Sequence, residues 1–272
     1  MTPQDPGGAS FYSSYMQIED PLVGAVRREA FGEDIGQFSW TTAEEMRRFF
    51  ALLELDARSR VLDVACGSGG PALFTARTTG CHVMGVDITA NGIQTATGLA
   101  ASLGLTGRAV FQQVDADAPL PFQDGSFDAV TSIDSMNHFL DRTRLLKEWY
   151  RVLRPGGLIL FTDPIVVTGM LTREEMITRS GSMGVFAFTP SGVDERFVAA
   201  AGFASPRVED VTDNIALVSG RWHRARASHA TELVGVEGQA AYDAFQDFLA
   251  VVHRLSSERR LSRILYVARR AA

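Results

Sequence analysis

A glycine-rich turn between an apolar stretch and an amphipathic one is the feature of this sequence best suited to bind a ligand. Gly67, Gly69 and Gly70 follow the apolar residues 61–66, and Pro71 suits the first turn of a helix. Glycine lets the backbone approach a ligand closely, and a helix N-terminus offers N–H groups that have no partner within the helix. The turn therefore predicts a site for a nucleotide.

An acidic residue ends the next apolar stretch, and its position leaves two classes of nucleotide site open. Asp87 could accept hydrogen bonds from both hydroxyls of a ribose. Gly67-x-Gly69-x-x-Ala72, with an acid about 20 residues on, also satisfies the dinucleotide pattern of NAD-dependent oxidoreductases. Asp63, four residues before the first glycine, favours a nucleotide site other than the dinucleotide site of an NAD-dependent oxidoreductase. The alternative interpretation is that these residues are structural, as a tight turn followed by an exposed acidic residue.

His138 is the candidate general base. It follows the fourth stretch that is expected to form a strand, and open α/β sheets bind ligands beyond the carboxyl ends of their strands. An imidazole has an ordinary pKa near neutrality, which suits the removal of a proton. The alternative interpretation is a histidine that orders its own loop.

The elements that must position these residues follow an alternating pattern from about residue 42 onward. Short apolar stretches typical of buried strands alternate with amphipathic stretches typical of helices. Such alternation predicts a parallel sheet with right-handed crossovers in one α/β domain. Strands are expected at 60–65, 82–87, 109–114, 127–133, 158–162, 207–211 and 264–268, with helices that include 91–104, 141–153 and 193–201.

Composition excludes several other classes. The 272 residues are 46% hydrophobic and 21% charged, as in globular proteins, and the net charge of −6 argues against a nucleic-acid-binding surface. The sequence contains neither a membrane-spanning apolar run nor a secretory signal, which predicts a soluble, cytoplasmic protein without a membrane partner. Cys66 and Cys81 form no metal-binding motif, so no metal site is expected. The oligomeric state stays open.

The order of the motifs resembles that of the class I S-adenosylmethionine-dependent methyltransferases. Residues 61–69 resemble the first motif of that family, and the resemblance extends over about residues 42–212. It implies a Rossmann-like α/β fold with a seven-stranded sheet, an antiparallel last strand and helices on both faces. It also implies S-adenosylmethionine as the cofactor. The later matching segments are Asp87, Asp115-Ala116, Leu120-Pro121-Phe122, Ser126-Phe127-Asp128 and Arg151–Gly157.

The resemblance assigns the methionine and ribose parts of the cofactor to the first two strand ends. The backbone at Gly67 and Gly69 would contact the methionine part, and Asp63 would hold nearby polar groups. Asp87 would bind the ribose hydroxyls, with Ile88 beside the adenine ring.

The resemblance assigns the adenine and the sulfonium to the next two strand ends. Asp115 would accept a hydrogen bond from the adenine amino group, with Ala116 packed near the base. One extra residue in this stretch leaves Asp117 as the alternative acid. Ser132 or Ile133 would border the sulfonium.

The flanking segments predict a cover over the sheet edge. Residues 1–41 are interpreted as an N-terminal lid, and residues 42–272 as the methyltransferase domain with lid insertions at about 164–190 and 214–258. This layout resembles small-molecule methyltransferases that act on phosphobases, glycine derivatives or natural products. In the phosphobase members a lid tyrosine pairs with a loop histidine, which implies catalytic roles for Tyr15 and His138, with Tyr12 as the alternative tyrosine.

The predicted reaction is methyl transfer to a small molecule, with an amine nitrogen as the preferred acceptor. The alternatives are O- or C-methylation of a natural-product or prenyl-type substrate, a non-methylating cyclase that keeps the cofactor, and an NAD-dependent oxidoreductase. Acidic residues near the fifth strand would favour an amine, whereas Arg179 would favour a phosphate or carboxylate. The aromatic residues expected to face the acceptor are Phe38, Trp40, Phe186, Phe188 and Trp222.

Overall fold

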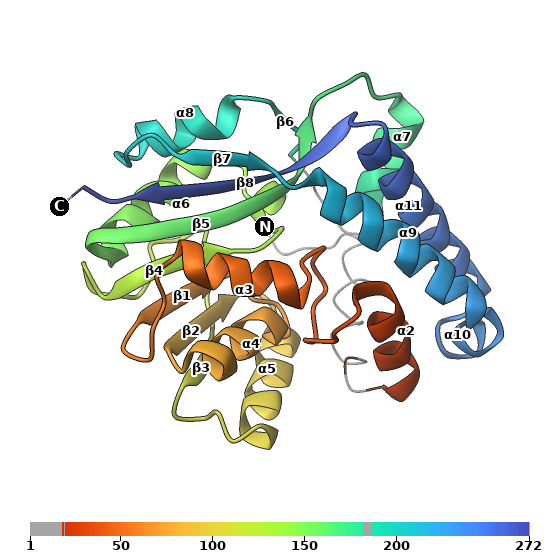
Figure 1. Ribbon diagram of the computed structural model, residues 1–272, viewed down its shortest axis with the longest axis horizontal. Helices are drawn as coiled ribbons and strands as arrows, with labels where there is room; N and C mark the ends of the chain where they lie inside the picture. The colour runs from red at the N-terminus through yellow and green to blue at the C-terminus, as the bar shows by residue number, and fades with distance from the viewer. Residues whose placement is uncertain (1–17, 19, 182–186, 272) are drawn as a thin grey trace.

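A mixed β-sheet lies at the centre of the computed structural model, which describes residues 18, 20–181 and 187–271 (Figure 1). The strand order is β3-β2-β1-β4-β5-β8-β7, and β8 is antiparallel to both of its neighbours. The predicted Rossmann-like fold with an antiparallel last strand is therefore confirmed. The strands are β1 Arg60–Val64, β2 His82–Asp87, β3 Ala109–Gln113, β4 Phe127–Ser132, β5 Leu153–Val167, β7 Arg207–Asp210 and β8 Leu261–Arg269.

The fifth strand is longer than the sequence pattern predicts. Strand β5 continues to Val167, past Pro164, where the sequence predicts an end near residue 162. The register with β8 shifts between Asp163 and Val166, so Pro164 lies in an irregularity where its missing N–H breaks no regular ladder. The extension also pairs with a two-residue strand, β6 Thr189–Pro190, which brings the sheet to eight strands.

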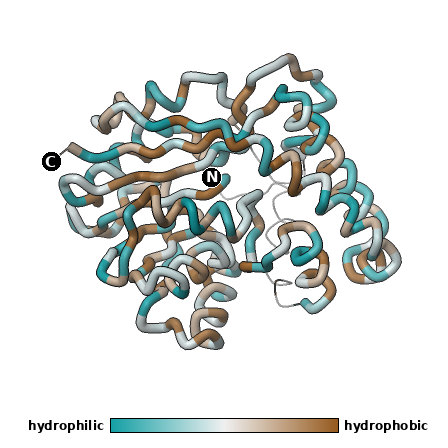
Figure 2. Tube along the Cα trace, viewed as in Figure 1, coloured by the Kyte–Doolittle hydropathy of each residue, from teal (hydrophilic) through white to brown (hydrophobic). Residues whose placement is uncertain are grey.

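Helices cover both faces of the sheet. On one face lie α3 Ala43–Leu52, α4 Gly70–Thr79 and α5 Ala90–Ser102, and on the other lie α6 Arg142–Val152 and α8 Val193–Ala200. Each face buries its own apolar cluster, as expected for a sheet enclosed on both sides. Figure 2 shows hydrophobic residues along the central strands.

A separate helical layer lies beside the sheet at the right of Figure 1. It contains α2 Pro21–Phe31, α9 Thr212–Ser228, α10 Ala230–Glu237 and α11 Gln239–Ser257, which share an apolar cluster of their own. Helix α7, Arg173–Gly181, packs against α11. The segment 214–258, which the sequence predicts to be an insertion, lies in α9, α10 and α11. Within the described ranges, no helix is long and apolar enough to cross a membrane.

Candidate functional site

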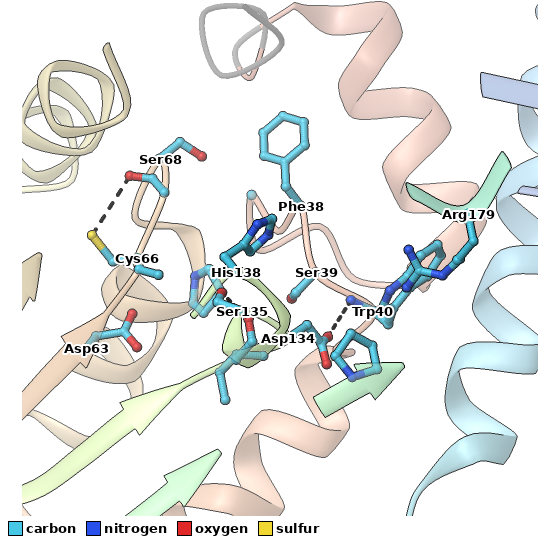
Figure 3. Close-up of a pocket in the computed structure, with 16 residues that line it drawn as sticks. Phe38, Ser39, Trp40, Asp63, Cys66, Ser68, Asp134, Ser135, His138 and Arg179 are labelled. Carbon is cyan, nitrogen blue, oxygen red and sulfur yellow. Dashed lines mark hydrogen bonds between the residues drawn. The ribbon is translucent and has the colours of Figure 1, made fainter. Parts of the chain in front are cut away.

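A cavity opens beyond the carboxyl ends of β1 and β4 (Figure 3). It contains about 720 Å³ of empty space, counting the part open to solvent. Three segments that are distant in sequence form most of its wall, within residues 36–40, 63–71 and 133–138, and two single residues, Pro164 and Arg179, complete it. The sheet edge expected to bind a ligand therefore carries this cavity.

The glycine turn forms one end of the cavity and needs its glycines. Gly67 and Gly69 have φ values of 55° and 80°, in the left-handed region that favours glycine. A Cβ on Gly69 would lie 2.7 Å from Ala96 Cβ, and one on Gly70 would lie 2.2 Å from the carbonyl oxygen of Gly36. The chain segment before α3 therefore rests directly on the start of α4.

Asp87 organises this turn. Its carboxylate accepts hydrogen bonds from the backbone N–H of Gly67 at 2.8 Å and from the N–H and hydroxyl of Thr89 at 2.8 Å and 2.6 Å. Three of the four lone-pair positions of a carboxylate are then used inside the protein. Ile88 follows with an exposed side chain, at the next strand end along the same edge.

Asp63 is a second buried carboxyl group, and it lines the cavity itself. The hydroxyl of Thr131 donates to its Oδ1 at 2.7 Å. Burial raises the pKa of Asp63 to about 7, and the neighbouring Asp87 adds to the rise. Two carboxyl groups near one turn give this end of the cavity a preference for a cationic ligand.

The residues predicted to bind a base continue along the edge beyond this cavity. Asp115 is exposed and its Oδ1 accepts the N–H of Asp117 at 2.8 Å, while the side chain of Asp117 forms an ion pair with Arg144 at 2.9 Å. Ala116 between them is buried. Arg144 of α6 thus holds the side chain of Asp117, and the side chain of Asp115 accepts a backbone N–H of its own loop.

Two non-glycine residues in the left-handed region mark the strand ends around the cavity. Ala65 after β1 has a φ of 59°, and Asp134 after β4 has a φ of 57°. Such conformations cost free energy and cluster at functional sites. Beside them, Ile133 lines the cavity, and the Ser132 hydroxyl is buried without a hydrogen-bond partner among the described residues. No sequence signal identified these two backbone conformations.

His138 ends a short 3₁₀ helix, Met136–His138, and its side chain faces the cavity between the two ends (Figure 3). The residue is exposed at the cavity, and desolvation by the surrounding protein lowers its pKa to about 4. The guanidinium of Arg179 acts in the same direction, against Asp87 and Asp163. The imidazole is therefore neutral at physiological pH, with a pKa below the near-neutral value expected from sequence. Tyr15, its predicted partner, lies outside the described residues.

Arg179 of α7 occupies the opposite end of the cavity from Asp63, Cys66 and Ser68 (Figure 3). The side chain is 1% exposed, and its guanidinium carbon lies 5.2 Å from the centre of the Phe248 ring. Burial lowers the pKa of Arg179 to about 10, so the group stays cationic at neutral pH. The cavity thus has an acidic end at the glycine turn and a cationic end at α7.

Only part of the predicted aromatic set faces this cavity. Phe38 and Trp40 line it. Trp222 instead packs edge-on against Trp40, with 6.0 Å between ring centres, inside the helical layer, and Phe188 packs against the apolar cluster of β5 and α11. The prediction for Trp222 and Phe188 is wrong because helical spacing and composition cannot distinguish a cavity wall from the core behind it. Phe186 lies outside the described residues.

Sequence comparisons match this chain to methyltransferases. The methyltransferase domain family matches residues 62–161. The O-methyltransferase resE of Aspergillus sclerotiorum is 30% identical over 210 residues, which cover 76% of this chain and 79% of that protein. The 27-O-demethylrifamycin SV methyltransferase of Amycolatopsis mediterranei is 29% identical over 74% of this chain and 75% of that protein. Identity to methyltransferase GfsG of Streptomyces halstedii is 42%, over 46% of this chain and only 44% of that relative's length.

Solved structures share the fold. A phosphoethanolamine N-methyltransferase 2 of Haemonchus contortus, in complex with phosphomonomethylethanolamine and S-adenosylhomocysteine, superposes with a TM-score of 0.80 at 20% identity over 96% of this chain and 60% of that chain. The [4+2]-cyclase SpnF superposes with a TM-score of 0.73 at 24% identity over 97% of each chain. With the family match and the relatives covered over most of their length, the chain belongs to the S-adenosylmethionine-dependent methyltransferases.

Proposed function

We propose that this enzyme methylates a hydroxyl group on a neutral or anionic small molecule. The observation that carries the proposal is the buried guanidinium of Arg179 at the end of the cavity away from the glycine turn. A cationic amine beside it would suffer like-charge repulsion in a water-poor site, whereas an oxyanion would be stabilised. The two relatives that match over three quarters of their own length carry names of oxygen-directed methyltransferases, which supports the same choice. The amine preference from sequence stays a prediction.

The acidic end suits the cofactor. The glycine turn leaves no room for a Cβ at Gly69 or Gly70. Two buried carboxyl groups, Asp63 and Asp87, lie near this turn and favour a ligand with positive charge there. The unpartnered hydroxyl of Ser132 lies at the end of β4 beside Ile133, where the family resemblance assigns the sulfonium. In this assignment the Asp115 carboxylate binds the adenine amino group, and Ile88 and Ala116 pack near the base. When bound, S-adenosylmethionine supplies an electrophilic methyl group on a positively charged sulfur.

The residues between the two ends would then prepare the acceptor. His138, neutral in the cavity, accepts the proton of the acceptor hydroxyl. Arg179 stabilises the negative charge that develops on the oxygen, and Phe38 and Trp40 supply apolar walls that exclude water. Methyl transfer is an in-line displacement, so alignment of the oxygen within the cavity contributes most of the remaining rate.

Matched acceptors test this function. The enzyme is incubated with methyl-labelled cofactor and with pairs of compounds that carry either a hydroxyl or an amine on the same skeleton, including phenols, aliphatic alcohols and carboxylated aromatics. We expect label on the hydroxyl members, and we expect Arg179→Met to lower their kcat/KM by about 10²-fold, the usual cost of one oxyanion-stabilising group. Arg173→Met, an exposed arginine of the same helix, is the matched control. Label on amines alone would contradict the proposal, and cofactor binding without any label would favour the non-methylating cyclase.

The contact between Gly70 and the preceding segment yields a further prediction. In Gly70→Ala the new methyl group meets the carbonyl oxygens of Gly36 and Ile35 at 2.2 Å and 2.5 Å, so the segment must leave the glycine turn. We expect S-adenosylhomocysteine to bind at least about tenfold more weakly, because a group misplaced by about 1 Å loses its alignment. Titration calorimetry measures the change. Gly98→Ala in α5, where the Cβ meets nothing within 4 Å, should leave the affinity unaltered. Equal affinity for the Gly70 variant would mean that the segment does not shape the cofactor site.

A further inference from the structure

A fully buried arginine lies beneath the acceptor end of the cavity. Arg263 of β8 is 0% exposed. Its Nε donates to Asp134 Oδ1 at 2.7 Å, and its Nη1 donates to both carboxylate oxygens of Glu45 at 2.7 Å and 2.8 Å. Burial alone would lower the pKa of Arg263, but Asp134 and Glu45 hold it above its usual value. One guanidinium therefore joins β8, the end of β4 and the first turn of α3.

The same two carboxylates connect to the backbone of Trp40, Asp134 directly and Glu45 through Asn214. The N–H of Trp40 donates to Asp134 Oδ2 at 2.8 Å. The carbonyl of Trp40 accepts from Asn214 Nδ2 at 2.9 Å, and this amide also donates to Glu45 Oε2 at 3.0 Å. The N–H of this cavity-lining tryptophan is thus held by a partner of Arg263, and its carbonyl is held by an amide that the other partner of Arg263 binds.

Asp134 also begins the loop that carries His138. Its backbone has a φ of 57°, and the hydroxyl of Thr162 both accepts the Asp134 N–H at 2.8 Å and donates to Asp134 Oδ1 at 2.7 Å. A strained conformation persists only when its surroundings fix it, and the ion pair with Arg263 is one of these restraints. The arginine therefore acts on the candidate base as well as on the acceptor wall.

We infer that Arg263 is a positioning residue of the methyl transfer, which fixes Trp40 and the His138 loop so that the cavity receives its acceptor in line. The inference rests on the proposed function, which assigns the acceptor to this end of the cavity. Arg263 is not among the residues that line the cavity. Its expected signature is a change in acceptor kinetics with little change in cofactor affinity.

Arg263→Lys is the first test, because lysine keeps the charge but cannot bond both carboxylates through a planar fork. We expect the acceptor kcat/KM to fall by about 10²-fold, since a misplacement of about 1 Å costs that much, while the Kd of S-adenosylhomocysteine stays within twofold. Arg151→Lys is the control. Arg151 also bridges two carboxylates, Glu148 and Asp124, but it lies near the amino ends of β4 and β5, away from the cavity.

Asn214→Ala is the second test, for the case in which Arg263→Lys fails to fold. It releases the Trp40 carbonyl and leaves the Arg263 ion pairs intact. The same kinetic signature is expected at about a tenfold loss. Hydrogen exchange of the Trp40 amide, which requires no acceptor, should be at least about tenfold faster in Arg263→Lys than in Arg151→Lys.

The outcomes separate this inference from the proposed function. Absence of methyl transfer by the wild-type enzyme, on any acceptor, would overturn the proposed function, and the exchange measurement would then decide on Arg263. Unchanged exchange at Trp40, acceptor kinetics within twofold in folded variants, or equal losses in acceptor and cofactor binding would each overturn the positioning role.

Discussion

His138→Ala is expected to lower kcat by about 10²–10⁴-fold, the usual contribution of a positioned general base. The imidazole faces the cavity between its acidic and cationic ends and is neutral at physiological pH. In this assignment His138 acts on the acceptor and does not bind the cofactor. The Kd of S-adenosylhomocysteine should therefore stay within twofold, and single-turnover assays with labelled cofactor measure the chemical step.

The pH profile distinguishes a base from a residue that orders the loop. A base must be unprotonated, so activity falls as the pH drops through its pKa. Because desolvation by the protein around the cavity lowers the pKa of His138 to about 4, kcat/KM on a hydroxyl acceptor should stay level from about pH 8 down to about pH 5. If the base were a histidine with an ordinary pKa of about 6.5, kcat/KM would fall as the pH drops through that value. A decline centred near pH 6.5 would contradict the lowered pKa.

His138→Gln and His82→Ala complete the comparison. Glutamine keeps a hydrogen-bonding side chain but cannot take a proton, so it should be nearly as slow as alanine. His82 lies exposed at the start of β2, at the opposite edge of the sheet, and its replacement should leave turnover unaltered. Full turnover by His138→Gln would limit His138 to ordering its loop. Tyr15 would then be the next candidate, through Tyr15→Phe.

The sheet could be predicted from sequence because its signals are local. Apolar runs such as residues 61–66 end in glycine or acid, and the amphipathic stretches between them carry caps, such as Thr42 at the start of α3. The continuation of β5 past Pro164 could not be predicted. Proline reads locally as the end of a strand, whereas its place here depends on pairing with β8, which lies about 100 residues further on.

The candidate site likewise has a part that could be predicted from the sequence and a part that could not. The geometry of the glycine turn and of Asp87 depends on a few neighbouring residues. The spacing of these residues in the sequence therefore predicts where they lie in the fold. The cationic character of the acceptor end depends on Arg179 being buried against α11, which contributes Phe248 from almost 70 residues away. The left-handed backbone at Asp134 depends likewise on Arg263, a residue of the last strand. Contacts of this range leave no periodic signal in the sequence.

Asp87→Ala is expected to weaken the binding of S-adenosylhomocysteine by about 10²-fold or more. The change removes the acceptor of the Gly67 N–H and of both Thr89 donors, and with it the one lone-pair position that is left to accept a ribose hydroxyl. Each buried polar group left without a partner costs about 1–3 kcal/mol, and about 1.4 kcal/mol corresponds to a factor of ten in Kd. Titration calorimetry gives the affinity directly.

Asp128→Ala provides the matched control for this loss. Asp128 also holds a backbone N–H, that of Arg60, at 2.7 Å, but it lies at the amino end of β4. Its replacement should cost stability without a change in cofactor affinity. An Asp87 variant that binds within twofold of wild type would remove Asp87 from the cofactor site.

An analogue that lacks one ribose hydroxyl separates the two roles of Asp87. If Asp87 only anchors the glycine turn, wild type and Asp87→Ala should lose the same factor when the hydroxyl is removed. If the carboxylate also binds the ribose, the wild-type enzyme should lose at least about tenfold, and the variant almost nothing, because its partner is already gone. The fourth lone-pair position of the carboxylate, beyond the three that Gly67 and Thr89 engage, makes the second outcome the expected one.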